Sequence, residues 1–523
     1  MWDLSRRMLI AAGGLVLAPS GVFAAGASPV AKTTNGPVRG YLDGATKVFK
    51  GVRYGADTGP RRFRPPLPPT PWIKIADATA FGPSSPQGAQ DVERQSEDCL
   101  VLNVWTPALG DGAKRPVMVY IHGGAYSNGS GSSPVYDGAR LSRRGDVVVV
   151  TINHRLNVFG YGFLARLAGP DFTDSGNAGM LDILLALRWV ANNAAAFGGD
   201  PGRVMVFGQS GGGAKIATMM AMPSAAGLFH TAATMSGQQV TASGPLHATE
   251  RMGLFLDAVG LSRARAAEAA TLPVAKLLEG LAVRDPFTPG GLYFGPVLDE
   301  RSLARHPFWP DAAPQGLKIP MIIGNAHDEA RAFVAHSRPD PFTMGWDDVA
   351  GRIAPEMRVD IDPDHVVAEY RRIYPNYSPT EVFFAAITAG RSWRGAVIEA
   401  EERARAGAPA FVYQLDLPTT IEGGRLRAMH TGDIALVLDN LGAKGSPTAP
   451  SPAAQSVADK MSESFIALAK TGNPNNPAIP TWTPYDLTRR ATMVFDADTR
   501  AVDDPRGAER RLFAKVPYIQ PGT

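Results

Sequence analysis

The sequence predicts an α/β protein built around one mostly parallel, doubly wound sheet. Short apolar runs without polar alternation recur along the 523 residues, as expected of strands that are buried on both faces. Segments of helical character lie between these runs, and strands that alternate with helices favour a parallel sheet. The predicted core strands are 117–121, 147–153, 204–207, 232–235, 320–324, 410–415 and 492–495, and the predicted helices include 180–195, 250–258, 383–406 and 453–469.

Two long stretches, about 243–316 and 335–400, fit this alternation poorly and are rich in Pro, Gly and aromatic residues. Ligands of doubly wound sheets bind beyond the carboxyl ends of the strands. We therefore predict that both stretches are cap-like insertions over that edge, inside one large domain at 28–523. Their tryptophans Trp309, Trp346 and Trp393 are candidates for pocket lining and equally for core.

Composition excludes several classes of function. A hydrophobic fraction of 45% and a charged fraction of 19% are typical of a soluble globular protein. The net charge is +3 and no block of Lys or Arg is present, so we expect no nucleic-acid partner. Cys99 is the only cysteine, so it cannot form an intramolecular disulfide, and we interpret it as a small buried hydrophobe. No HExxH or cysteine cluster occurs, and we expect neither a metal nor a cofactor.

The first 27 residues have the pattern of an export signal. Ser5-Arg6-Arg7 precedes an apolar stretch at 8–17, and small residues at 22–27 offer a cleavage site. This pattern predicts a twin-arginine signal peptide at 1–27, recognised by the twin-arginine translocation machinery, and a periplasmic or secreted mature protein. The alternative is an uncleaved membrane anchor. The apolar run is short and is broken by glycine and proline, so we expect no stable membrane span in the mature protein.

Residues 208–213 read Gly-Gln-Ser-Gly-Gly-Gly. A match to Gly-x-Ser-x-Gly alone is weak, because a serine in a flexible turn would look the same. Here a short apolar run at 203–207 precedes it and a helical segment at 214–222 follows. Strand, sharp turn and helix are the context in which a serine hydroxyl is held above the sheet edge. The sequence therefore predicts that Ser210 is a nucleophile.

A nucleophilic serine needs a base and an acid that orients the base, and in such hydrolases they follow in the order serine, acid, histidine. His365 lies at a predicted helix start and needs no special role, whereas His430 lies in a loop after a core strand, from which it can reach the turn. Asp328 and Glu329 both qualify as the acid, and their positions do not separate them. Asp328 would also serve as the N-cap of a helix that begins near Ala330. The histidines well downstream of the serine are His327, His336, His365 and His430.

The predicted strand 117–121 runs into His122-Gly-Gly-Ala125. A glycine turn of this HGGG type supplies backbone N–H groups that stabilise the negative oxygen formed during acyl transfer. An ordinary turn at a strand end would look similar. It would have less reason to occur together with the turn around Ser210.

With these motifs the chain resembles the type-B carboxylesterase family, which includes bacterial carboxylesterases and the cholinesterases. The resemblance implies an α/β-hydrolase fold, Glu329 as the acid, His430 as the base, and the N–H groups of Gly124, Ala125 and Gly211 as oxyanion donors. It also implies a supporting buried serine at Ser236, although a serine satisfied by backbone at a strand end is equally plausible. The matching segments are 49–54, 62–66, 96–104, 122–125, 154–160, 177–182, 197–201, 208–212, 328–329 and 429–434. Within them, the resemblance implies two structural ion pairs, Arg62 with Glu97 and Arg155 with Asp182.

The turn around Ser210 departs from the usual family pattern, Gly-Glu-Ser-Ala-Gly. Gln209, which we expect to support the site, replaces the glutamate, and Gly211 replaces the alanine. The lost carboxylate argues against a cationic, choline-like substrate. The resemblance thus implies a serine carboxylic ester hydrolase that forms an acyl-enzyme with small to medium, uncharged esters and releases it with water. The alternatives are an amidase or carbamate hydrolase, a non-catalytic binding or adhesion protein of the same fold, and an exported oxidoreductase, whose cofactor ligands the sequence lacks.

Overall fold

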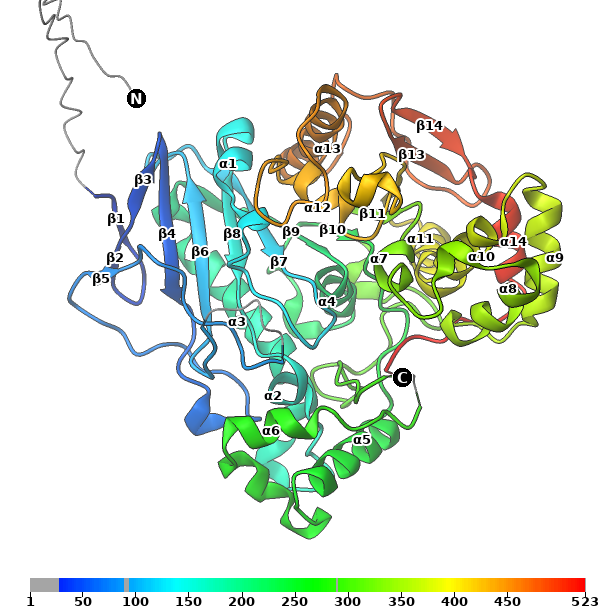
Figure 1. Cartoon of the computed structure of the whole chain (residues 1–523). Coiled ribbons are helices and arrows are strands. Elements are labelled where there is room, and N and C mark those ends of the chain that lie inside the picture. Colours follow the sequence, from blue (N-terminus) through cyan, green and yellow to red (C-terminus); the bar gives the residue numbers. More distant parts are fainter. Residues whose placement is uncertain (1–27, 89–93, 288–289, 523) are drawn as a thin grey trace, which may run out of the picture.

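A computed structural model describes residues 28–88, 94–287 and 290–522; the predicted signal peptide lies outside them. A central sheet of eleven strands runs through the molecule in the order β14-β13-β12-β11-β10-β9-β7-β8-β6-β4-β3 (Figure 1). In this order, all neighbouring strands between β13 and β8 pair in parallel. The pairs at the two ends of the sheet, β14 with β13 and those among β8, β6, β4 and β3, are antiparallel. The mostly parallel, doubly wound sheet is therefore confirmed.

All seven predicted core strands are present, as β7 to β13. The strands of the large sheet are β3 (Tyr41–Asp43), β4 (Thr46–Arg53), β6 (Val101–Thr106), β7 (Arg115–Ile121), β8 (Val148–Ile152), β9 (Gly199–Gln209), β10 (Thr231–Met235), β11 (Met321–Ala326), β12 (Ala410–Leu415), β13 (Ala491–Phe495) and β14 (Arg500–Asp503). A small separate sheet consists of β1 (Val30–Lys32), β2 (Pro37–Arg39) and β5 (Ala76–Asp77).

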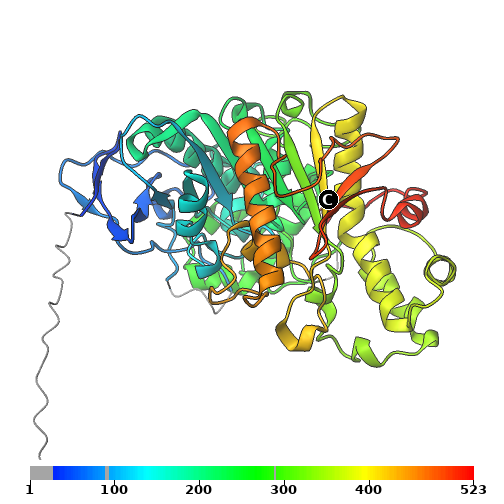
Figure 2. The ribbon, with the colours of Figure 1, turned by 90° about the horizontal axis from the view of Figure 1, so that it is seen from above.

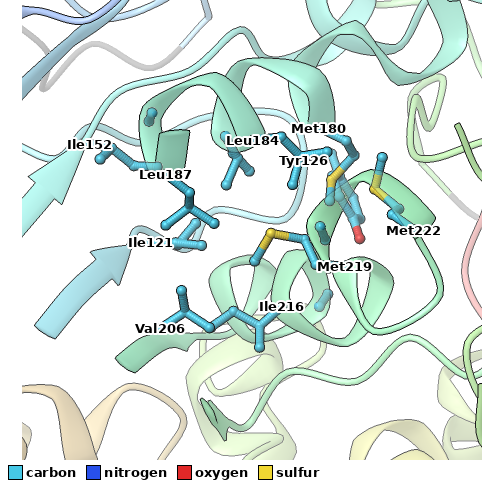
Figure 3. Packing of buried hydrophobic residues seen from close by; sticks show 14 of the residues in the cluster. Ile121, Tyr126, Ile152, Met180, Leu184, Leu187, Val206, Ile216, Met219 and Met222 are labelled. Carbon is cyan, nitrogen blue, oxygen red and sulfur yellow. The ribbon is translucent and has the colours of Figure 1, made fainter. Parts of the chain in front are cut away.

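Helices cover both faces of the sheet, which explains why its strands are apolar throughout. Val119 of β7 faces one hydrophobic core, and Met118 and Tyr120 face the other. The first core contains α3 and α4, and part of it is shown in Figure 3. In Figure 2, α13 (orange) lies along the sheet, against β7, β9 and β10. The covering helices are α2 (Asn157–Tyr161), α3 (Ala178–Asn193), α4 (Gly211–Met219) and α11 (Arg394–Arg405) for the first core, and α1 (Ala139–Gly145), α12 (Gly432–Val437) and α13 (Pro452–Thr471) for the second.

The two poorly patterned stretches fold as additional helical segments. The second stretch packs with α14 around an apolar core of its own, beside the sheet (Figure 1). The single predicted helix 383–406 is in the structure two helices, separated by a π-helical turn at Ala389–Trp393. The helices of the two stretches are α5 (Pro245–Ala258), α6 (Val274–Gly280), α8 (Trp346–Ile353), α9 (Pro363–Ile373) and α10 (Pro379–Thr388); α7 (Arg331–Val334) and α14 (Gly507–Phe513) lie outside them and pack with the second stretch.

Two buried ion pairs hold loops against the sheet. Nε and Nη2 of Arg155 donate to the two carboxylate oxygens of Asp182 at 2.8 and 2.6 Å, and both side chains are almost completely buried. Arg62 makes the same bidentate contact with Glu97 at 2.6 and 2.5 Å. Both pairings are thus confirmed. Because a buried charge without its partner is costly, these pairs stabilise the fold only as intact units.

Cys99 is completely buried and unpaired, as predicted. One helical run among the described residues, Pro170–Phe197, is long and apolar enough to cross a membrane, with a mean hydropathy of 1.2. The buried share of its most apolar window is 61%. Its main part is α3, whose apolar side belongs to the first core, so its hydrophobicity has a structural reason inside the protein.

Candidate active site

Ser210 lies between the end of β9 and the start of α4, at the carboxyl edge of the parallel strands. Its backbone has φ 56° and ψ −125°, a region that non-glycine residues rarely occupy. The neighbouring glycines allow this turn, because a Cβ at Gly212 would stand 1.9 Å from the carbonyl oxygen of Ile121. The N–H of Ser210 donates to the carbonyl of Met235 at 2.7 Å. The chain therefore holds this serine in a strained, tightly packed turn at the edge where ligands of such sheets bind.

Glu329 and His430, which are 101 positions apart in the chain, meet at this edge. Glu329 follows β11 and is completely buried. One of its carboxylate oxygens accepts hydrogen bonds from the N–H of Ala326 at 2.7 Å and from the amide of Asn325 at 3.3 Å. The other oxygen accepts the hydrogen bond of His430 Nδ1. A carboxylate in this position holds the proton on Nδ1 and leaves Nε2 free to accept one.

Asp328, the other acid that the sequence left open, points elsewhere. Its carboxylate lies 3.1 Å from Nε of Arg331 and 3.4 Å from Nδ1 of His327. The expectation that Asp328 caps a helix is wrong. The helix α7 begins at Arg331, its N-cap residue is Ala330, and no side chain accepts a hydrogen bond there. The carboxylate is instead paired with the guanidinium of Arg331, the first residue of this helix, because an opposite charge this close stabilises the ionised carboxylate.

Ser210 and His430 both line one pocket, with a volume of about 180 Å³. Within the described residues no hydrogen bond joins the serine hydroxyl to the imidazole. The amide nitrogen of Gln209 instead lies 3.2 Å from Nε2 and 3.4 Å from Nδ1 of His430. Hydrogen bonds of catalytic groups are often long without substrate and shorten when it binds. Gln209 is buried. Because this position carries glutamine and not glutamate, the group beside the imidazole is a neutral amide.

The glycine turn after β7 packs directly against the turn around Ser210. A Cβ at Gly211 would stand 2.0 Å from the carbonyl oxygen of Ala125. Gly124 and Ala125 have φ values of 83° and 51°, so the backbone is left-handed at both residues of this turn. In the described part of the chain, the N–H groups of Gly124, Ala125 and Gly211 have no acceptor. They are free to bind a negative oxygen next to Ser210.

Lys215 is a residue of this site that the sequence analysis missed. It lies in α4, is completely buried, and donates to the carbonyls of Ala125 at 2.6 Å and of His122 at 3.4 Å. Burial lowers the pKa of Lys215 to about 7. No Asp or Glu of the described residues forms an ion pair with it. The only signal in the sequence is a lysine in an otherwise apolar helix, five residues after the serine.

Ser236 and the three tryptophans named in the sequence analysis differ in their relation to this pocket. Ser236 is buried, has φ 50° and lines the pocket, but its hydroxyl has no hydrogen-bond partner among the described residues. Its supporting role stays a prediction. None of the three tryptophans lines this pocket. The lining residues are Ala125, Tyr126, Ser210, Gly211, Ala214, Ser236, Gly237, Gln238, Gln239, Tyr293, Phe333, Arg358, Arg391, Ser392, His430, Gln520 and Pro521.

These residues together can perform nucleophilic acyl transfer. A serine in a strained turn, an imidazole oriented by a buried carboxylate, and three free N–H groups are the parts that such chemistry needs. Within residues 28–88, 94–287 and 290–522, no group of three His, Cys, Asp or Glu side chains is placed to hold a metal ion.

Comparison with known proteins agrees with this chemistry. The model of the carboxylesterase family matches residues 27–513. The chain is 32% identical over 506 residues to the para-nitrobenzyl esterase of Bacillus subtilis, covering 92% of this chain and 98% of that protein. It is 31% identical over 490 residues to the phenmedipham hydrolase of Pseudarthrobacter oxydans, covering 89% and 94%. A solved carboxylesterase of Geobacillus stearothermophilus superposes with a TM-score of 0.83 at 35% identity, covering 92% of this chain and 99% of that one.

Proposed function

This chain belongs to the carboxylesterase family, and on that premise we propose that it hydrolyses small to medium carboxylic esters through an acyl-enzyme on Ser210. The observation that carries the proposal is the contact between His430 Nδ1 and the buried carboxylate of Glu329, beside a pocket that His430 shares with Ser210. An imidazole backed in this way is a general base for a neighbouring hydroxyl.

In the proposed reaction the Ser210 hydroxyl attacks the ester carbonyl while His430 Nε2 takes its proton. Glu329 stabilises the imidazolium that forms, and the N–H groups of Gly124, Ala125 and Gly211 bind the oxyanion. The C–O bond to the alcohol then breaks, and His430 returns its proton to the leaving oxygen. Water, deprotonated by the same imidazole, attacks the acyl-enzyme and releases the acid and the free serine.

Three substitutions test the assignment of these roles. We expect Ser210→Ala and His430→Gln to lower kcat for 4-nitrophenyl butyrate by about four to six orders of magnitude, and Glu329→Gln by about four. His365→Gln, on the surface helix α9, and Asp328→Asn serve as matched controls and should retain most turnover. A fluorophosphonate probe should label the wild-type protein at residue 210 and leave Ser210→Ala unlabelled. Full turnover by Ser210→Ala would exclude this nucleophile.

We also propose that the protein is exported by the twin-arginine route, on the pattern of the first 27 residues. Cell fractionation tests this proposal directly. Replacement of Arg6 and Arg7 by lysine should retain the protein in the cell, whereas unchanged export of that variant would contradict the proposed signal.

A further inference from the structure

Two guanidinium groups reach the pocket that contains Ser210 and His430. Arg358 and Arg391 both line it, and no Asp or Glu is among its lining residues. The other polar groups of the lining are neutral amides, hydroxyls and the imidazole. The pocket wall is therefore positively charged, although the protein as a whole carries a net charge of only +3.

Arg391 lies in the π-helical turn between α10 and α11, and such turns occur frequently at functional sites. Its Nη1 lies 2.5 Å from a carboxylate oxygen of Glu356. Its guanidinium also lies 4.8 Å from the centre of the Phe333 ring, and this ring lies 4.7 Å from the imidazole of His430. One aromatic ring thus separates Arg391 from the proposed base.

Arg358, unlike Arg391, has no acidic partner among the described residues. Among the described residues, no carboxylate lies within 4.0 Å of its guanidinium, and its side chain makes no hydrogen bond there. Both backbone polar groups of Arg358 are hydrogen-bonded. Its N–H donates to the carbonyl oxygen of Gly390 at 3.2 Å, and its carbonyl oxygen accepts from the N–H of Ile519 at 2.8 Å. The residue is half-buried. The chain therefore presents this cation at the pocket wall without neutralising it.

The two guanidiniums also act on each other. Burial, and then the charge of Arg358, lowers the pKa of Arg391, while Glu356 opposes this shift. Glu356 is the one acid that pairs with either arginine in the described part of the chain. Arg358, Arg391 and Glu356 together therefore carry an excess positive charge. An anion bound between Ser210 and the two arginines would reduce the repulsion between their guanidinium groups.

We propose that the natural substrates are esters that carry a free carboxylate, which Arg358 binds while the positive charge of Arg391 in the same pocket wall adds attraction. A guanidinium matches a carboxylate in geometry and charge and can bind both of its oxygens. This inference rests on the proposed ester hydrolysis at Ser210. It differs from the expectation of uncharged substrates, which rests on the replacement of a carboxylate by Gln209.

Two matched pairs of esters test the inference. Monoethyl glutarate and ethyl pentanoate differ in the acyl half, by a carboxylate in place of a methyl group. The alcohol halves of 4-acetoxybutanoate and butyl acetate differ in the same way. Turnover is followed by acid release in a pH-stat, with 4-nitrophenyl butyrate as a reference. We expect kcat/KM of the charged ester to exceed that of its neutral partner tenfold or more in one pair, which also identifies the half that Arg358 binds.

Variants then assign the preference to Arg358. Arg358→Gln should lower the charged-to-neutral ratio of kcat/KM by about tenfold to a hundredfold, as for the loss of a hydrogen bond between charged groups. Arg358→Lys keeps the charge without the two-pronged geometry and should retain part of the preference. Arg372→Gln, on the exposed side of α9, should leave the ratio at its wild-type value.

The outcomes separate this inference from the proposed function. If 4-nitrophenyl butyrate and all four esters were inert, ester hydrolysis itself would be the failed proposal. If the neutral esters were turned over as well as the charged ones, and Arg358→Gln left the ratio unchanged, the carboxylate preference would be overturned while the esterase stood.

Discussion

The close contact between the turn around Ser210 and the glycine turn after β7 predicts the effect of Gly211→Ala. The exchange introduces the residue that is usual in the family, yet here the new Cβ would stand 2.0 Å from the carbonyl oxygen of Ala125 and 2.5 Å from its Cα and carbonyl carbon. All three contacts are backbone atoms, so no side-chain rotation relieves them. Lys215 donates a hydrogen bond to the same carbonyl oxygen at 2.6 Å, and this bond opposes movement of the Ala125 carbonyl away from the new Cβ.

The size of the effect follows from these distances. Non-bonded heavy atoms pack at about 3.5 Å, so the Ala125 peptide has to move by about 1 Å or more. An N–H that donates at about 2.9 Å would then stand beyond hydrogen-bond distance. Two of the three proposed oxyanion donors lie on the segment that moves, and the loss of one such donor lowers kcat by about a hundredfold to a thousandfold. We expect Gly211→Ala to lower kcat by at least a factor of about a hundred.

The assay is steady-state hydrolysis of 4-nitrophenyl butyrate, with kcat and KM determined separately. The loss should fall on kcat, because the oxyanion forms only in the transition state. Gly351→Ala is the matched control, since a Cβ at Gly351 in α8 meets no atom within 4 Å. A Gly211→Ala enzyme that kept kcat within about threefold of the wild-type value would refute the assignment of these donors.

Two further predictions concern stability. Asp182→Ala leaves the buried Arg155 guanidinium unpaired and should lower the free energy of unfolding by about 3–5 kcal/mol in guanidinium denaturation; a loss below about 1 kcal/mol would contradict the structural role of the pair. Burial lowers the pKa of Lys215 from 10.5 to about 7, so between these values the unfolded chain binds a proton that the folded protein does not. Wild-type stability should therefore rise relative to Lys215→Met by about 1.4 kcal/mol per pH unit above pH 7, and parallel pH profiles of the two proteins would exclude the depressed pKa.

The sequence by itself determined where the core strands lie, that their sheet is mostly parallel, and the position of its serine turn; the order of the strands came from the structure. Strands buried on both faces have to be apolar along their whole length, so β7 to β13 were visible as short hydrophobic runs. The turn around Ser210 was visible because only glycine tolerates such close backbone contacts, as at Gly212. These signals are local, and each depends on the chain within a few residues.

The tertiary structure decided which charged side chains meet at the site, where the residue pattern had left Asp328 and Glu329 open and only the resemblance to the family had favoured Glu329. Asp328 and Glu329 are adjacent in the chain, and the direction of their side chains after β11 sends one to Arg331 and the other to His430. Arg358 comes from a segment with no regular pattern, whereas Arg391 lies inside the helix predicted at 383–406. Periodicity does not reveal the π-helical turn from which Arg391 lines the pocket. Contacts between charges depend on distances in space that sequence separation does not encode, so the charge of the pocket became visible only after the chain was folded.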